Sequence, residues 1–124
     1  RLYIGGTMIT ERYIINLFGM DTKYYTDDYL AHLWKICAEK EYQCAGIFIT
    51  AFIYISKYVC SSKAGCNVGE TVHVISTVRN PVEAADKAKF WESFLNITKE
   101  VRERLENPCM SLSIEEVEYR YFAK

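Results

Sequence analysis

The stretch 46–60 constrains the fold more than any other part of this chain, because it is almost entirely apolar and rich in β-branched and aromatic residues. It reads GIFITAFIYISKYVC and has neither proline nor an internal glycine, a composition that favours a strand over a helix. At a period of two residues it divides into two different faces. The aliphatic face comprises Ile47, Ile49, Ala51, Ile53, Ile55 and Val59, and the aromatic face comprises Phe48, Thr50, Phe52, Tyr54, Ser56 and Tyr58. We therefore expect a long strand with its aliphatic face in the core.

Two helices are predicted around this strand. The first is capped by Asp21 or Thr26, carries an apolar stripe that includes Leu30 and Trp34, and ends at Gly46. The second has Asn80 as its cap and runs to 107–108, because Pro81 suits a first helical position and Glu83 completes a capping box. Further strands are predicted over 11–18, 71–78 and 110–122, with a hairpin at Gly5-Gly6.

This order predicts an α+β fold, a two-layer sandwich in which both helices cover one face of a mainly antiparallel sheet. The βαββαβ order is ferredoxin-like and is preceded by the N-terminal β-hairpin. With 124 residues, half of them hydrophobic, residues 1–124 are expected to form one domain with a core of its own.

Composition excludes several classes of protein. A net charge of −1 argues against binding that depends on phosphate contacts, so nucleic acid is not an expected partner. No apolar run is long enough for a membrane span and no secretory signal is visible, so we expect a cytoplasmic protein. The five cysteines lack the paired spacing of zinc sites. We expect them to be reduced thiols, with no metal and no cofactor.

One sheet face is expected to lie uncovered by the helices. In the strand 71–78, the alternation is interpreted as placing Val72 and Val74 against the helices and His73 and Ile75 on the open face. The expected open face comprises Phe48, Phe52, Tyr54, Tyr58, His73, Ile75, Val117, Tyr119 and Tyr121. So much exposed apolar area predicts a cover, and a second copy of the chain is the simplest one.

Polar residues of this face and of the strand ends are the candidates for chemistry. His73 is a candidate general base and Glu115 a candidate acid or base. Tyrosine hydroxyls and arginine forks suit an anionic or aromatic ligand. The predicted ligand-binding residues are Tyr54, Tyr58, Tyr119, Arg12, Arg79 and Arg120. The structural alternatives are a histidine satisfied in the core, tyrosines that anchor an interface and arginines in surface salt bridges.

Two families share features with the chain. The order of elements, with TVHVISTV after a glycine-containing connection and a C-terminal SLSIEEVEY strand, resembles the tautomerase superfamily, particularly its hydroxymuconate-isomerase-like branch. That resemblance implies an N-terminal catalytic proline, whereas this chain has only Pro81 and Pro108. The segment LYIGG at 2–6 resembles the first strand motif of RNA-recognition domains, but GETVHVISTV lacks their aromatic, glycine-rich third strand.

Three function classes follow. The leading hypothesis is a homo-oligomeric small-molecule-binding protein with ligand pockets at its subunit interfaces. The second is a small enzyme of tautomerase, isomerase or lyase type that uses His73 or Glu115. The third is a nucleic-acid or protein interaction module that uses the aromatic face.

Overall fold

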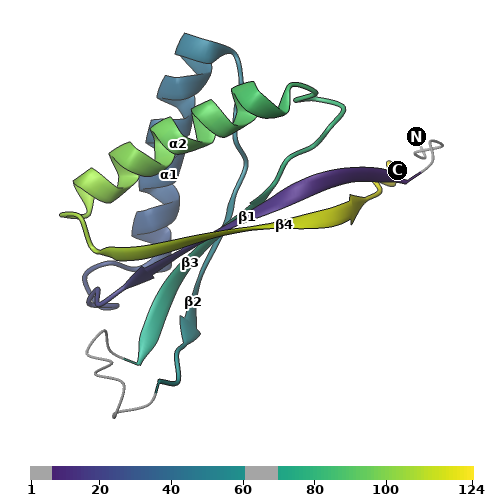
Figure 1. The fold of residues 1–124 in the computed structure, drawn as a ribbon. Coiled ribbons are helices and arrows are strands. Elements are labelled where there is room, and N and C mark those ends of the chain that lie inside the picture. The colour runs from purple at the N-terminus through teal and green to yellow at the C-terminus, as the bar shows by residue number, and fades with distance from the viewer. Residues whose placement is uncertain (1–6, 61–69) are drawn as a thin grey trace.

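The computed structural model describes residues 7–60 and 70–124, which form two helices on one face of a four-stranded sheet (Figure 1). The elements in chain order are β1 (Met8–Phe18), α1 (Asp27–Ala45), β2 (Phe52–Lys57), β3 (Thr71–Val78), α2 (Lys87–Arg104) and β4 (Cys109–Tyr119). The sheet order is β2-β3-β1-β4 and every pairing is antiparallel. The predicted α+β sandwich is therefore confirmed. The predicted hairpin at 5–6 lies outside the described residues.

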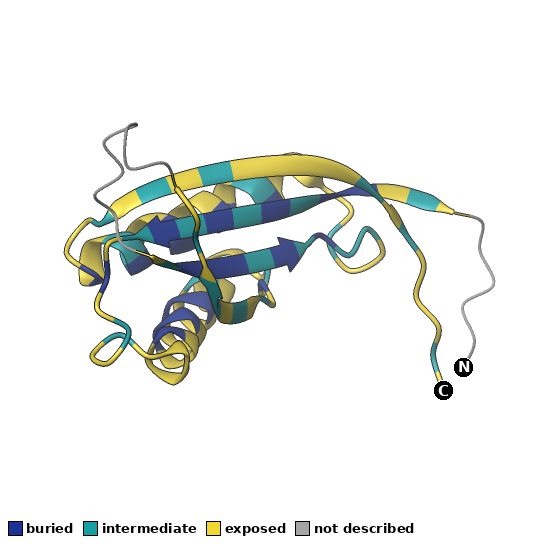
Figure 2. Cartoon of the chain, turned by 90° about the horizontal axis from the view of Figure 1, so that it is seen from below, coloured by how far each residue is buried: buried dark blue, intermediate teal, exposed yellow. Residues whose placement is uncertain are grey.

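The core lies between the helices and the two central strands. Tyr13, Ile15 and Leu17 point from β1 toward the helices and are almost fully buried. Figure 2 shows this alternation along β1 and a mostly buried β3, whereas the edge strand β4 is largely exposed. Trp34 of α1 and Phe94 of α2 pack against this row, with their ring centroids 6.1 Å apart. Each such side chain contributes about 1.5–3 kcal/mol by leaving water.

The predicted start of the first helix is confirmed, and that of the second is not. The Thr26 side chain caps α1, and Gly46, at φ 76°, ends it as expected. The predicted start of the second helix at Asn80 and Pro81 is wrong, because α2 begins at Lys87 with Asp86 as its cap. The Arg79 guanidinium binds the Ala84 carbonyl oxygen, so this oxygen is engaged by a side chain where a helix would begin. Residues 80–84 therefore form a separate turn.

The long strand predicted over 46–60 is also shorter in the structure. Only Phe52–Lys57 form a ladder, with β3, and residues 47–51 run alongside without strand pairing. Side chains bind the carbonyls there, since Trp34 Nε1 donates to Ile49 O at 2.9 Å and Thr77 Oγ1 donates to Thr50 O. Two side-chain hydrogen bonds thus take the place of ladder bonds in the first part of the predicted strand.

The predicted faces of β3 are reversed. His73, Ile75 and Thr77 point toward the helices, because they pair with the buried residues of β1, and Val72 and Val74 lie on the other face. Both sets contain β-branched residues, so alternation alone could not choose between them. The His73 ring is buried in the core, where Nε2 lies within hydrogen-bonding distance, 2.7 Å, of the Tyr25 carbonyl oxygen. The proposed place of His73 and Ile75 on the open face was therefore wrong.

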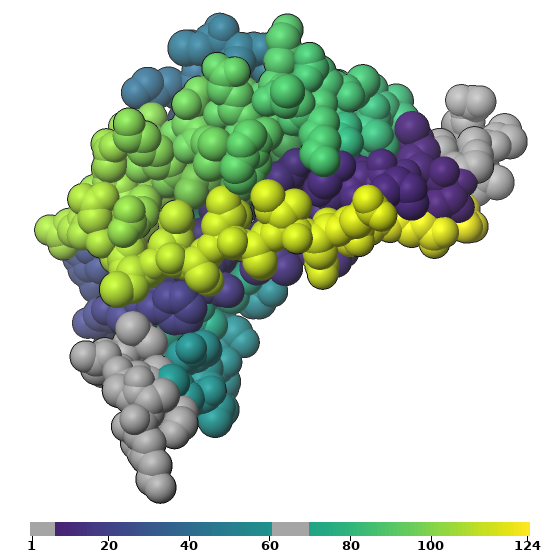
Figure 3. Space-filling view, in the orientation of Figure 1, coloured from purple at the N-terminus to yellow at the C-terminus, as the bar shows by residue number. Residues whose placement is uncertain are grey.

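The face opposite the helices is less exposed than predicted. Phe18 and Tyr58 pack edge to face with centroids 5.2 Å apart, and Val72 and Val74 are buried. The exposed aromatic area lies mainly on β2, where Phe52 is 71% and Tyr54 48% exposed. In the space-filling view α2 lies along β1 and β4, and β2 emerges below them (Figure 3). One sheet face is thus free of helices, but its exposed aromatic area is concentrated on the edge strand β2.

The cysteines differ from expectation at one position. Cys37, Cys44 and Cys109 are free thiols, as predicted, but Cys60 is disulfide-bonded. The thiol of Cys37 is buried, and this burial raises its pKa.

Neither α1 nor α2 has an apolar stretch long enough to cross a membrane.

Candidate functional site

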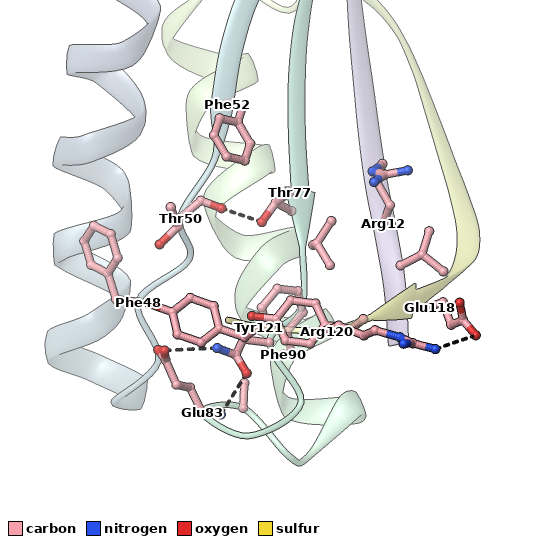
Figure 4. Close-up of a pocket in the computed structure, with 15 residues that line it drawn as sticks. Arg12, Phe48, Thr50, Phe52, Thr77, Glu83, Phe90, Glu118, Arg120 and Tyr121 are labelled. Atoms are coloured by element: carbon pink, nitrogen blue, oxygen red, sulfur yellow. Dashed lines mark hydrogen bonds and ion pairs between the residues drawn. The ribbon is translucent and has the colours of Figure 1, made fainter. Parts of the chain in front are cut away.

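A cavity of about 560 Å³ lies at the end of the sheet where β3 leaves for the 80–84 turn (Figure 4). Five parts of the chain meet there: β1, the unpaired segment 47–51 with the start of β2, the end of β3 with its turn, α2, and the end of β4 with the residues after it. Its volume lies in the range of about 300–1,000 Å³ that is typical of small-molecule sites. The cavity is therefore the candidate functional site.

Aromatic side chains form much of the wall. Phe48 and Phe52 come from the unpaired segment and the start of β2, Phe90 from α2, and Tyr119 and Tyr121 from the end of β4 and beyond. The hydrogen bonds to the carbonyls of residues 49 and 50 fix the segment that carries Phe48. Such rings offer flat apolar surfaces to a planar ligand and π faces to a cation.

The turn after β3 places a carboxylate in the cavity. Asn80 Oδ1 accepts from the Val82 amide at 2.9 Å, and Asn80 Nδ2 donates to Glu83 Oε1 at 3.1 Å, so one side chain closes the turn and orients Glu83 (Figure 4). Tyr119 also lines the cavity. Its pKa is raised, first by burial and then by the nearby negative charge of Glu83.

Two arginines and a second glutamate complete the polar lining. Arg12 NH1 lies 2.6 Å from Glu115 Oε1, and both side chains are partly exposed. Arg120 NH2 donates to Thr7 Oγ1 at 2.7 Å and lies 3.9 Å from Glu118 Oε1. The formal charges that line the cavity are therefore balanced, with Arg12 and Arg120 against Glu83 and Glu118. This balance suits a ligand that carries charges of both signs.

A buried ion pair lies behind the turn. The Arg79 guanidinium binds both carboxylate oxygens of Glu11, at 2.8 and 3.0 Å, and the Tyr13 hydroxyl donates to Glu11 Oε1 at 2.9 Å. The hydrogen bond from Arg79 lowers the pKa of Glu11 against the opposing effect of burial. Burial, followed by the bond to Glu11, raises the pKa of Tyr13 to about 12. Glu11 is thus held as a carboxylate and Tyr13 as a phenol.

The cavity brings together some of the residues predicted from the sequence. Arg12, Tyr119 and Arg120 line it, and Glu115 is the ion-pair partner of Arg12. Arg79 is almost fully buried beside Glu11, although the turn that follows it lines the cavity. Their roles in binding or catalysis stay predictions.

Three other predicted residues lie outside this cavity lining. Tyr54 is exposed on β2, and Tyr58 packs on Phe18. His73 is fully buried beneath the helices, with Nε2 against the Tyr25 carbonyl oxygen. Their proposed functions also stay predictions. One ring nitrogen of His73 is bonded in the core, and among the described residues its Nδ1 has no hydrogen-bond partner.

Sequence reasoning missed the two acidic residues of the lining. Glu83 was interpreted as part of a helix capping box, and Glu118 was not singled out in the predicted strand 110–122. A signal for Glu83 was present, because Asp86 is a second good cap six residues after Asn80 and leaves room for a separate turn. The pairing that brings Glu118 next to β1 is long-range, and no local pattern encodes it.

The lining offers groups that can bind and orient a ligand. Among the residues that the structure describes, no group of three His, Cys, Asp or Glu side chains is arranged to hold a metal ion. The arginines suit a carboxylate, the glutamates suit a cationic group, and the rings suit a planar heterocycle. Together they fit a zwitterionic ligand with an aromatic part.

One family model matches almost the whole chain, and two solved structures share its fold. Residues 8–123 match the family model described as SAM lyase. A solved phage SAM lyase in its apo state is 19% identical at a TM-score of 0.55, with 98% of this chain and 94% of that one covered. A phage SAM lyase in complex with S-methyl-5'-thioadenosine is 20% identical at a TM-score of 0.52, with 99% and 94% covered. No curated protein matches. The tautomerase resemblance is thus supported only as a small α+β fold.

Proposed function

The chain belongs to the SAM lyase family, and on that premise we propose that it cleaves S-adenosylmethionine in the cavity at the end of the sheet. The observation that carries the proposal is the match of that family over residues 8–123, which include nearly every described residue of the fold. A lyase was part of the enzyme alternative drawn from the sequence. The family therefore favours this alternative over the leading hypothesis of a binding protein without catalysis.

The products follow from the chemistry of the substrate. One similar solved structure is described as a complex with S-methyl-5'-thioadenosine, which is S-adenosylmethionine without its four-carbon amino-acid arm. A lyase splits the molecule without water, and one way to do so is for the arm to close on itself. In the step we propose, a carboxylate oxygen attacks Cγ, the Cγ–S bond breaks, and its electron pair neutralises the sulfonium. The products are S-methyl-5'-thioadenosine and a protonated amino lactone, and atoms and charge balance.

Such a step asks the protein mainly for orientation. The nucleophile and the leaving group belong to one molecule, so the site must hold the carboxylate in line with the Cγ–S bond. Opposite charges disappear as the bond breaks, and a site with little water favours such a reaction. No general base is required. The cavity, which has two arginines and several rings but no histidine in its lining, is consistent with this demand.

The lining suggests a place for each part of the substrate. Arg12 or Arg120 would bind the carboxylate, and Glu115 would orient Arg12 through their 2.6 Å contact. Glu83 and Glu118 would face the ammonium and sulfonium groups. Phe48 and Tyr121 would stack on the adenine ring and exclude water.

We further propose that the active protein is a homo-oligomer in the cytoplasm with the cavity at a subunit interface. Support comes from exposed rings near the cavity, since Phe52 is 71% and Tyr121 58% exposed. A second copy would cover these rings and exclude water from the substrate. Native mass spectrometry tests this part, and a monomer at assay concentration would contradict it.

The lyase proposal is tested with pocket variants and a matched control. Glu83→Gln and Arg120→Gln are each expected to lower kcat/KM for S-adenosylmethionine at least about tenfold, equivalent to about 1.4 kcal/mol. Glu100→Gln removes a carboxylate from an ion pair on α2 outside the cavity lining and is expected to behave like wild type. Formation of S-methyl-5'-thioadenosine is followed by liquid chromatography. An active wild type with equally active pocket variants would place the chemistry elsewhere.

A further inference from the structure

The turn that carries Glu83 is held from behind by a buried polar network. Arg79 uses its guanidinium in two directions, toward both oxygens of Glu11 on β1 and toward the Ala84 carbonyl oxygen at 2.8 Å. The side chains of Arg79 and Glu11 are only 7% and 11% exposed. One arginine therefore ties the central strand to the far end of the turn.

The start of the turn is fixed to the same strand. The Arg79 amide donates to the Glu11 carbonyl oxygen at 3.1 Å, and Thr10 Oγ1 donates to the Arg79 carbonyl oxygen at 2.8 Å. Between these anchors, the Asn80 side chain binds the Val82 amide, and its backbone oxygen accepts from the Ala84 amide at 2.9 Å. The turn is thus bonded at its beginning, its middle and its end.

Stability alone does not explain this arrangement. Two charges pay a desolvation cost when they are buried, and well-packed apolar side chains of similar size are often as stabilising as a buried ion pair. Such a pair can nevertheless fix one geometry, because the charges have few alternative partners in the interior. Here the geometry that is fixed is a wall of the cavity.

We infer that the Glu11–Arg79 pair consists of positioning residues, which hold the 80–84 turn so that Asn80, Glu83 and Ala84 form a rigid wall of the substrate cavity. The inference rests on the proposed function and assigns residues that do not themselves face the substrate. Arg79 was predicted from the sequence as a ligand-binding residue. Its contacts assign it to the support of the wall.

The two contacts of the guanidinium explain why position 79 requires arginine. The planar fork of Arg79 makes a bidentate contact with Glu11 and still has NH1 for Ala84 O. Lysine has one ammonium on a flexible stem, so at this position it would keep the charge but could not reproduce the fixed two-sided contact. Arg79→Lys therefore tests whether the positive charge alone is sufficient or whether the fixed two-sided contact is needed. Glu11→Gln keeps the shape of the partner and removes its charge.

The test combines amide hydrogen exchange with steady-state kinetics on the purified full chain. Arg79→Lys and Glu11→Gln are each expected to speed exchange at the Val82 and Ala84 amides by about tenfold. They are also expected to raise KM for S-adenosylmethionine by about tenfold. Glu100→Gln, which weakens the ion pairs of Glu100 with Lys40 of α1 and Arg104 of α2 away from the turn, should change neither. A merely structural role would reduce the fraction of active protein, and hence apparent kcat, with KM unchanged.

Each outcome decides the inference. Faster exchange together with a raised KM supports it, in either variant should the other fail to fold. Unchanged exchange, or faster exchange with an unchanged KM, overturns it. A wild-type protein that forms no S-methyl-5'-thioadenosine refutes the proposed function instead. In that case unchanged exchange in the variants would still overturn the inference. Faster exchange would support only the statement that the ion pair holds the turn, without a role in substrate binding.

Discussion

Breaking the buried ion pair by removing one partner should be far more damaging than removing both. Arg79→Met leaves the Glu11 carboxylate nearly buried, with the Tyr13 hydroxyl as its remaining close donor and the exposed Lys87 3.9 Å away. A stranded buried charge costs about 3–5 kcal/mol, a large part of the roughly 5–15 kcal/mol that keeps a domain folded. Glu11→Leu with Arg79→Met removes both charges. It still leaves the Ala84 carbonyl without its donor, as Arg79→Met alone does, and the buried Tyr13 hydroxyl without its acceptor, a loss of about 1–3 kcal/mol for each group.

Urea unfolding at neutral pH, followed by circular dichroism, measures these differences. The double variant is expected to be more stable than Arg79→Met by about 2 kcal/mol. Arg104→Met is the control, because it breaks an exposed pair with Glu100 that is worth only about 0.3–0.5 kcal/mol. A loss below about 1 kcal/mol in Arg79→Met, or a double variant as unstable as the sum of the single ones, would refute the reasoning.

Three further predictions concern the same wall and its surroundings. Because the pKa of Glu11 is lowered on folding, its contribution to stability is present above the ordinary carboxyl pKa of 4.5 and is lost as pH falls through the lowered value. Urea midpoints measured from neutral to acidic pH should therefore fall less steeply in Glu11→Gln than in wild type, and identical slopes would contradict this. Tyr13 should ionise near pH 12, and Tyr13→Phe should remove that step from the ultraviolet titration of the tyrosines. A titration with no step missing from the variant would assign it elsewhere. Thr77→Val should cost about 1–2 kcal/mol, because the Thr50 carbonyl loses its donor. Thr98→Val should cost almost nothing in the same urea assay, since Thr98 Oγ1 has no hydrogen-bond partner among the described residues, and equal losses would argue against the Thr77 contact.

Local patterns in the sequence predicted much of the fold. The Thr26 cap, the Gly46 stop and the apolar strand over 11–18 are short-range signals, and each forms as expected. The order of strands and helices then leaves few ways to arrange an antiparallel sheet. These signals were sufficient for the α+β sandwich.

Errors arose where a long-range contact overrode a local pattern. The Asn80 box is a good helix start by itself, but the bond from Arg79 to Ala84 O closes it as a turn. The 46–60 stretch favours a strand throughout, but side chains of Trp34 and Thr77 bind its first carbonyls. Both departures from local preference lie at the cavity.

The candidate site was predicted only in part for the same reason. Arg12, Tyr119 and Arg120 were identifiable as polar or aromatic residues near strand ends, and all three line the cavity. Glu83 and Glu118 gain their positions only from the turn and from the pairing of β4 with β1. His73 was assigned to the wrong face because both faces of β3 carry β-branched residues.

The central claim is that this chain cleaves S-adenosylmethionine in the cavity that Glu83 lines. The most direct measurement is chromatographic detection of S-methyl-5'-thioadenosine after incubation of the purified protein with S-adenosylmethionine, beside a sample without protein and one with Glu83→Gln. We expect product to form at a rate proportional to the amount of wild-type protein, and at least about tenfold more slowly with the variant. Product no faster than in the protein-free sample would contradict the lyase, and equal rates for the two proteins would contradict the site.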